Sequence, residues 1–349
     1  MQSRVLKNRL RSLAMMAAVG AFFGAQAVVA QARSLDPLTP TEIAERSREL
    51  VQVPWHGEAP ETDQGKLGDC LKKAVTIKVG DPINNTSKDL LLTVIRPPTK
   101  RPVPVVIVVP TVAGVTLVER ETASELCQIG IASIIADVND TSIPENLPAW
   151  GHEDETNRHS ILSLRTTIDF AKQNIHFDPA RVGLMGLSLG AVQSAFLAGL
   201  EANRLAAVVL VLAGGNLPYV MSTSDNGQVV KLREARMEHE HMTSVDEYES
   251  MLRKTMRYDP TYFASNANPK NIFMVISDND TKVPTLVQKE LFVDLGSPQS
   301  TTFSTNHVET IMSMTFVYFH YVGDFFKSRF EMSKDLNLSI PKRIDVRTY

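Results

Sequence analysis

The chain has 349 residues, with 36 Lys and Arg against 39 Asp and Glu and a formal net charge of −3. This weakly acidic balance lacks the basic electrostatic footprint of a nucleic-acid-binding protein, so no nucleic-acid partner is expected. Hydrophobic residues make up 43% of the sequence, which is typical of a globular chain with one large domain or two small ones.

The N-terminal segment predicts export. Four basic residues and no acidic one precede an apolar run over residues 13–30, and small residues at alternate positions follow. This is the pattern of a cleavable signal peptide, so we expect residues 1–32 to be removed and the mature protein to be secreted or periplasmic. Loss of those four positive charges changes the formal net charge from −3 to −7. The alternative is an uncleaved anchor, because about 18 apolar residues can just span a bilayer.

The rest of the chain predicts an α/β domain. Residues 33–73 are expected to be a lead-in packed on the main domain, with a short helix at residues 41–50. From residue 74 to 328, strand-like and helix-like segments alternate, which predicts a doubly wound, mostly parallel sheet. The expected strands are residues 75–79, 90–95, 103–109, 132–136, 181–185, 206–212, 272–277 and 300–303. The expected helices are residues 117–128, 157–173, 189–201, 285–295 and 309–328, followed by a C-terminal tail at residues 329–349.

One connection is unusually long. Almost 60 residues separate the strand that ends at Leu212 from the strand that begins at Ile272. Long connections in compact domains are usually functional, so residues 216–262 predict a helical cap over a binding site. The cap contains five methionines, which suit an apolar ligand but equally suit packing beneath a helical insertion.

A serine between two glycines stands where a strand is expected to turn into a helix. The sequence Gly186-Leu187-Ser188-Leu189-Gly190 follows the apolar strand and precedes a run of small residues. A nucleophile on such a turn needs strained backbone angles, and flanking glycines remove the Cβ atoms that would clash. A helix N-terminus also stabilises developing negative charge, so Ser188 is a candidate nucleophile.

A serine nucleophile needs a base, and the base needs an orienting acid. Asp278 and Asp280 follow the expected strand at residues 272–277, and His307 follows the strand at residues 300–303. This chain order predicts a triad of Ser188, Asp280 and His307. Asp280 is preferred over Asp278 because it lies in the loop proper, four residues before Pro284.

These motifs resemble the α/β-hydrolase superfamily, in particular its serine esterase and dienelactone hydrolase-like members. The resemblance covers residues 74–328 and implies an α/β-hydrolase fold with the nucleophile, acid and base at the three triad positions. It also implies an oxyanion hole formed by the backbone N–H of Leu189 and a second donor after the strand at residues 103–109. The usual His-Gly pattern of that loop is replaced by Pro110-Thr111, so Val112 or Thr111 could be the second donor, and we prefer Val112.

Other chemistry-bearing residues favour simpler interpretations. His239 and His241 are two apart, so on a helix they point about 200° away from each other and predict no metal site. His152 and His159 could contact substrate or simply pack. Cys70 and Cys127 could form a disulfide after export or remain buried thiols.

Together these patterns predict an exported serine hydrolase that cleaves an ester or related acyl bond through an acyl-enzyme on Ser188. The expected partner is a small, apolar acyl compound, and neither cofactor nor metal is expected. Two alternatives remain: a serine peptidase with the same triad, and a catalytically silent binding protein on the same fold.

Overall fold

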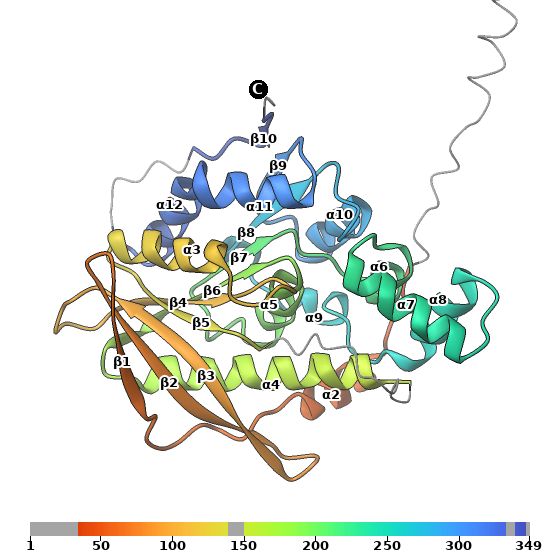
Figure 1. Cartoon of the computed structure of the whole chain (residues 1–349), viewed down its shortest axis with the longest axis horizontal. Helices are drawn as coiled ribbons and strands as arrows, with labels where there is room; N and C mark the ends of the chain where they lie inside the picture. The colour runs from red at the N-terminus through yellow and green to blue at the C-terminus, as the bar shows by residue number, and fades with distance from the viewer. Residues whose placement is uncertain (1–33, 139–149, 333–338, 347–349) are drawn as a thin grey trace, which may run out of the picture. The chain divides into compact units, whose positions relative to one another are not determined.

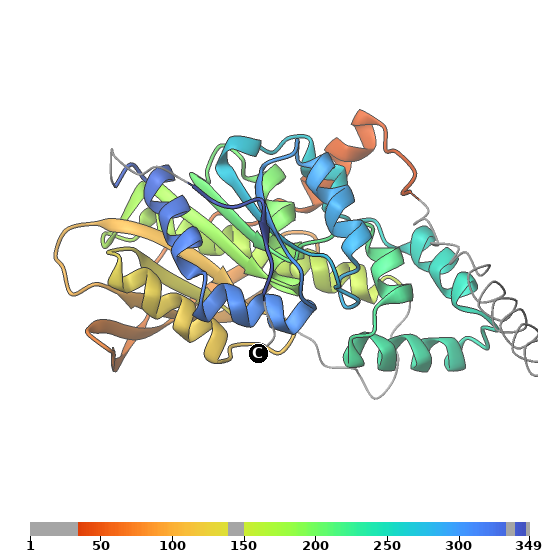
Figure 2. The ribbon, with the colours of Figure 1, turned by 90° about the horizontal axis from the view of Figure 1, so that it is seen from above.

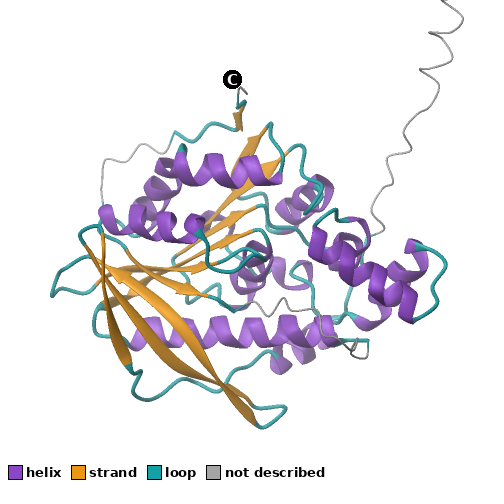
Figure 3. Cartoon of the chain, in the orientation of Figure 1, coloured by secondary structure: helices purple, strands orange, loops and turns teal. Residues whose placement is uncertain are grey.

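The structure is a computed structural model that describes residues 34–138, 150–332 and 339–346. Its centre is a ten-stranded sheet with the order β1-β2-β3-β5-β4-β6-β7-β8-β9-β10 (Figures 1 and 3). The strands are β1 (Glu61–Leu67), β2 (Cys70–Asp81), β3 (Thr86–Arg96), β4 (Val103–Val109), β5 (Ala132–Ala136), β6 (Phe177–Leu187), β7 (Ala207–Val211), β8 (Ile272–Ser277), β9 (Gln299–Phe303) and β10 (Arg343–Ile344). The strands from β5 to β10 pair in parallel, whereas β1, β2 and β3 pair antiparallel.

Helices cover both faces of this sheet. They are α2 (Pro40–Glu49), α3 (Leu117–Gln128), α4 (His152–Gln173), α5 (Leu189–Leu200), α6 (Leu217–Thr223), α7 (Gly227–His239), α8 (Val245–Thr255), α9 (Thr261–Ala264), α10 (Thr285–Asp294), α11 (His307–Phe316) and α12 (Phe319–Arg329). Successive residues of β4 enter two separate cores: Val105 and Ile107 pack with α4 and α5, while Val106 and Val108 pack with α3 and α12. Burial on both faces explains why the central strands are unbroken runs of Val and Ile.

The structure confirms the predicted sheet and extends it at both edges. β1 lies inside the predicted lead-in, residues 33–73, and β10 lies inside the predicted tail, residues 329–349. β1 is almost wholly exposed, so its sequence has none of the apolar alternation that indicates a strand. β1 and the first residues of β2, from Cys70, therefore extend the sheet into the segment predicted as the lead-in.

One expected helix is two. The segment predicted as residues 309–328 forms α11 and α12, separated at Val317 and Tyr318. Both amide groups donate to the carbonyl of Ser313, which closes the end of α11. The run Thr315–Phe319 is β-branched and aromatic, and such residues have weaker helix propensity.

The predicted cap segment, residues 216–262, contains α6, α7, α8 and the start of α9, and its first three helices lie together at one side of the molecule (Figures 1 and 2). It is not a separate layer, because Tyr248 and Leu252 are fully buried in the same core as α4 and α5. Met221, Met237, Met242 and Met256 also belong to that core or pack against it. Four of the five cap methionines thus fill the underside of the insertion.

Candidate active site

The serine turn has the strained backbone that a nucleophile position requires. Ser188 lies between the end of β6 and the start of α5 with φ 55° and ψ −117°, a backbone conformation that residues with a side chain rarely adopt. A Cβ on Gly186 would lie 2.2 Å from the carbonyl oxygen of Gly190, and one on Gly190 would lie 2.3 Å from that of Val109. Neither glycine can therefore be replaced without moving the backbone.

Three side chains from distant parts of the chain meet at the carboxyl ends of the parallel strands. The Nε2 of His307 lies 2.9 Å from the Oγ of Ser188, and its Nδ1 lies 2.7 Å from the Oδ2 of Asp280. All three residues are buried. They form one hydrogen-bonded chain of carboxylate, imidazole and hydroxyl, which can move a proton from the serine to the histidine.

Local capping fixes the histidine. His307 is the first residue of α11, and Asn306 caps that helix by accepting the N–H of Glu309 at 3.0 Å. The Glu309 carboxylate accepts the N–H of Asn306 in return, which completes a capping box. The helix start, and hence the position of the imidazole, is set by these two reciprocal hydrogen bonds.

A buried glutamine holds the acid. The side-chain N–H₂ of Gln288 donates to Asp280 Oδ2 at 2.8 Å and to the carbonyl of Val283 at 2.7 Å, while its oxygen accepts the N–H of Ser277 at 3.2 Å. Asp280 Oδ1 accepts the backbone N–H groups of Lys282 and Val283 at 2.9 and 3.0 Å. Sequence reasoning missed Gln288, which lies one turn inside α10 and carries no motif.

The cap is tied to the same acid loop. The hydroxyl of Thr281 donates to Asp225 at 2.8 Å, and the hydroxyl of Ser224 donates to the carbonyl of Lys282 at 2.7 Å. The Thr281 hydrogen bond and the Lys282 ammonium hold the pKa of Asp225 below its ordinary value. The segment between α6 and α7 therefore braces the loop that carries Asp280.

Asp278, the competing acid, is engaged elsewhere. Its carboxylate pairs with Lys289 at 3.1 Å and with Arg343. Burial raises the pKa of Asp278, but the hydrogen bonds from these two cations outweigh it and the net shift is downward. Asp280, not Asp278, contacts His307 in this structure.

The loop after β4 is anchored by a buried acid. Glu119 is fully buried in α3, where it accepts the backbone N–H of Thr116 at 2.7 Å and that of Thr111 at 3.3 Å. The N–H of Thr111 thus donates to Glu119, and the choice of Val112 as the second oxyanion donor stays a prediction. Leu189, the other expected donor, is the first residue of α5.

The remaining histidines do not form a shared site. His239 is the last residue of α7, and His241 lies beyond it with φ 55°, so the two are not on one helix. His159 lies near Asp81 and Glu155, and ligand atoms of the three approach within 4.8 Å of one another. The Arg158 guanidinium already pairs with both carboxylates, so we assign no metal there.

Cys70 and Cys127 form a disulfide, which resolves the alternative left open by the sequence. The bond joins β2 to the last turn of α3 and closes a sequence separation of 57 residues. Both cysteines are buried in the core on the α3 face.

Comparison with known proteins gives a fold and a family similarity over part of the chain. Residues 91–229 match the dienelactone hydrolase family. Two acetyl xylan esterase structures, from a Paenibacillus and a Thermoanaerobacterium species, are each 16% identical with TM-scores of 0.62 and 0.60. Those alignments cover 81% and 85% of this chain and 96% of each esterase. A cold-adapted esterase from an Arctic intertidal metagenomic library is 15% identical with a TM-score of 0.50, over 79% of this chain and 99% of that one.

At these identities the structural likeness shows the fold alone. No curated protein sequence matches the chain. The structural likeness shows an α/β-hydrolase fold, and residues 91–229 within that fold are similar to the dienelactone hydrolase family.

Proposed function

We propose that this protein is an exported serine esterase in which Ser188 is the nucleophile, His307 the general base and Asp280 the orienting acid. The observation that carries the proposal is the continuous hydrogen-bonded chain from Asp280 through His307 to Ser188. The strained turn at Ser188 adds to it, because such strain persists only where the surrounding structure enforces it.

The geometry supports a two-step acyl transfer. His307 Nε2 takes the proton of Ser188 as its Oγ attacks the ester carbonyl, and the backbone N–H groups of Leu189 and Val112 receive the developing oxyanion. The tetrahedral intermediate collapses, and His307 returns the proton to the departing alkoxide, which leaves as an alcohol. Water then attacks the acyl-enzyme with His307 again as base, releasing the acid and restoring Ser188.

Export rests on two independent features. The signal pattern at residues 1–32 lies outside the described residues, but the Cys70–Cys127 disulfide is the kind of bond that persists in secreted and periplasmic proteins. Among the described residues, no helix combines the length and apolarity needed to cross a membrane. N-terminal sequencing of the exported protein should give a start between residues 28 and 33, and Met1 on a membrane-bound protein would favour the anchor.

The nucleophile can be tested directly. A fluorophosphonate should label one serine in the wild type, and Ser188→Ala should abolish both labelling and turnover without changing the far-UV circular dichroism. The matched control is Ser194→Ala, at the buried second turn of α5. Labelling that survives in Ser188→Ala would place the nucleophile elsewhere.

A substrate panel separates the esterase from the peptidase alternative. p-Nitrophenyl esters from acetate to longer acyl chains should be cleaved, and aminoacyl p-nitroanilides should not. Acetate is the first ester to try, because two similar structures are acetyl xylan esterases. The apolar character of the acyl group stays a prediction, tested by the rise or fall of kcat/KM with chain length.

A further inference from the structure

Three of the described helices begin with the same local motif, but only one of the three buries its acid. α2, α3 and α11 each open with a capping box, in which a glutamate in the first turn accepts the backbone N–H of the residue before the helix. Glu42 of α2 and Glu309 of α11 are exposed, whereas Glu119 of α3 has an exposed fraction of 0%. Capping alone does not require this burial, which points to a further role for Glu119.

Both oxygens of Glu119 are engaged. Its Oε2 accepts the backbone N–H of Thr116 at 2.7 Å and the hydroxyl of the same residue at 2.6 Å. Its Oε1 accepts the backbone N–H of Thr111 at 3.3 Å, eight residues earlier in the chain. Within the described residues no ion pair compensates the carboxylate, and these three donors together with the N-terminus of α3 stabilise it instead. The position of Glu119 is therefore tied to the loop that it contacts.

The contact from Glu119 fixes the base of the loop after β4. While the N–H of Thr111 donates to Glu119, its carbonyl accepts the N–H of Gly114 at 3.0 Å, and its hydroxyl accepts the N–H of Ala113 at 3.3 Å. Gly114 has a φ of 73°, a conformation that favours glycine. The four-residue turn 111–114 is thus built on Thr111.

The direction of the Val112 N–H follows from this arrangement. The peptide between Thr111 and Val112 is planar and trans, so its N–H points opposite to its C=O. Because the carbonyl of Thr111 is directed at the N–H of Gly114, the N–H of Val112 is directed away from the inside of the turn. Glu119 holds the preceding peptide, so the predicted second oxyanion donor is fixed through both sides of Thr111.

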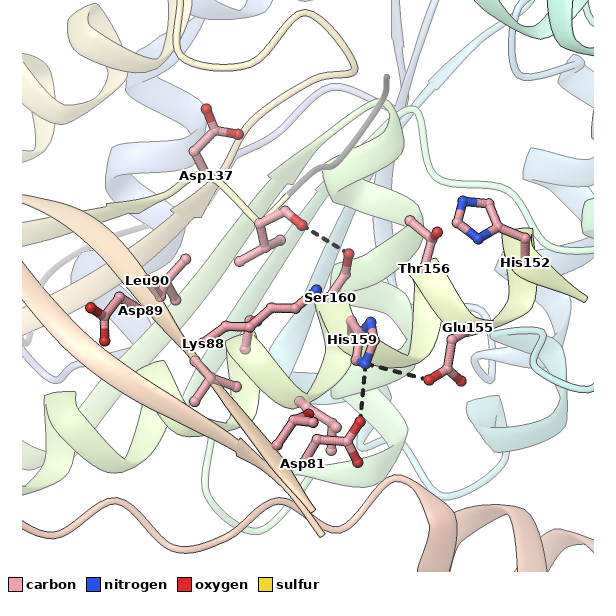
Figure 4. Close-up of a pocket in the computed structure, with 15 residues that line it drawn as sticks. Asp81, Lys88, Asp89, Leu90, Asp137, His152, Glu155, Thr156, His159 and Ser160 are labelled. Carbon is pink, nitrogen blue, oxygen red and sulfur yellow. Dashed lines mark hydrogen bonds and ion pairs between the residues drawn. The ribbon is translucent and has the colours of Figure 1, made fainter. Parts of the chain in front are cut away.

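This loop is confined on two sides. A Cβ on Gly190, which follows the other predicted donor, Leu189, would lie 2.5 Å from the carbonyl oxygen of Pro110 at the start of the loop. Toward β5, a Cβ on Gly114 would lie 3.2 Å from the carboxylate of Asp137, which lines the cavity in Figure 4. Among the described residues, that cavity shares no lining residue with the triad or with this loop. A change at the base of the loop therefore displaces the loop itself.

Resting on the proposed serine esterase function, we propose that Glu119 is a positioning residue of the active site, which holds the loop after β4 so that the N–H of Val112 receives the oxyanion. Glu119 acts through Thr111 and does not touch the substrate. An oxyanion donor stabilises charge that develops only in the transition state, so a displaced donor lowers kcat and leaves KM little changed.

Glu119→Gln breaks one contact selectively. Glutamine also completes a capping box, and its single acceptor oxygen faces the two donors of Thr116, which leaves its N–H₂ group against the N–H of Thr111. We expect kcat for p-nitrophenyl acetate to fall about thirtyfold, with KM changed less than about twofold and the free energy of unfolding not lowered. The fall is smaller than the roughly 100- to 1,000-fold loss that follows removal of an oxyanion donor.

A transition-state analogue separates positioning from a loss of folded protein. The Oγ of Ser188 adds to the boron of phenylboronic acid as His307 takes its proton, which gives a tetrahedral boronate anion. Its inhibition constant should rise in Glu119→Gln by about the factor by which kcat/KM falls, because both depend on the same N–H groups. All rates are divided by the concentration of sites that a fluorophosphonate labels.

Glu42→Gln is the matched control, because it makes the same change in the exposed capping box of α2, and it should leave both constants unchanged. Three results would overturn the positioning role: an unchanged kcat in Glu119→Gln, an inhibition constant that does not follow kcat/KM, or an unfolded variant. If the wild type cleaves p-nitrophenyl acetate, each of these results leaves the esterase proposal standing. If the wild type does not cleave it, the esterase proposal itself fails.

Discussion

At the turn between β6 and α5, the backbone conformation of Ser188 sets the direction of its hydroxyl group. Ser188 has a positive φ that directs its hydroxyl away from both the strand and the helix, toward His307. This backbone conformation costs a free energy on the order of 1–3 kcal/mol. The close packing at Gly186 and Gly190 holds the chain in it. A serine in an ordinary tight turn would not have a buried imidazole 2.9 Å from its hydroxyl.

The two neighbouring aspartates make a sharp comparison. Asp280→Asn should reduce kcat by up to about four orders of magnitude, because the imidazole loses its orienting partner and its countercharge. Asp278→Asn should cost roughly tenfold or less, since Asp278 pairs with Lys289 and Arg343 instead. Steady-state kinetics on both variants, with folding checked by circular dichroism, decide it. The opposite ranking would transfer the acid role to Asp278.

Gln288 is expected to act through Asp280. Gln288→Met keeps the length of the side chain but removes the donor to the carboxylate, so Asp280 is held less firmly against the imidazole of His307. We expect kcat to fall roughly tenfold while KM and the free energy of unfolding change little. Lys289→Met, at the next and exposed position of α10, is the control. A fall in kcat that is matched by a loss of stability would mean that Gln288 only supports the fold.

Among the helices and strands, the apolar pattern of the sequence predicted most of the elements. β4, β5, β8 and α3 have the predicted bounds because each is a continuous buried run or a capped helix. β1 and β10 were not predicted because an edge strand is held by backbone hydrogen bonds, which any residue can make. The side chains of β1 are almost all exposed, so its sequence shows no apolar pattern. Gln288 and Glu119 were missed for a different reason: a single polar residue inside a helix is ambiguous until the fold shows what it faces.

The insertion between β7 and β8 is more structural than its sequence predicts. Its side chains share the core of α4 and α5, and Arg236, almost fully buried in α7, pairs with Glu153 at 3.2 Å and stacks over Trp150. Excision of residues 216–262 would expose this core. We therefore expect loss of folding rather than a change of substrate preference, contrary to the simplest expectation for a lid.

Tyr248 of α8 tests that packing. Its ring is fully buried and, within the described residues, its hydroxyl has no hydrogen-bond partner. Tyr248→Phe should leave stability unchanged or raise it by about 1 kcal/mol, because a buried unsatisfied hydroxyl is removed. Tyr248→Ala should lower the free energy of unfolding by about 3–5 kcal/mol through the cavity that it leaves. Urea denaturation measures both, and a marked loss in Tyr248→Phe would show that the hydroxyl is satisfied in solution.

For the molecule as a whole, the disulfide is expected to contribute to stability. It closes a sequence separation of 57 residues between β2 and α3. In the chain-entropy model a loop of this size stabilises the folded state by about 4 kcal/mol. The double variant Cys70→Ser, Cys127→Ser should therefore have a free energy of unfolding lower by about 4 kcal/mol, measured by urea denaturation. Dithiothreitol should destabilise the wild type but not the variant. If the reductant has no effect on the wild type, the bond is not formed in the protein.

The pH dependence of global stability should be sensitive to Asp154, at the start of α4. Its burial raises the pKa from 3.8 to about 6, although its carboxylate accepts the backbone N–H groups of Arg257 and Tyr258, each at 2.9 Å. Below about pH 4 the group is protonated in both states. Above about pH 6 it is ionised in both, and this ionisation costs the folded state up to about 3 kcal/mol.

Stability from this group is therefore present at low pH and is lost as the pH rises from about 4 to 6. Asp154→Asn keeps an oxygen that can accept both N–H groups and removes the charge. The free energy of unfolding of the variant minus that of the wild type should increase by about 2–3 kcal/mol from pH 4 to pH 7.5, measured by urea denaturation. Glu58→Gln, at an exposed position, should follow the wild-type curve. Parallel curves for Asp154→Asn and the wild type would show that Asp154 titrates alike in the folded and unfolded chains.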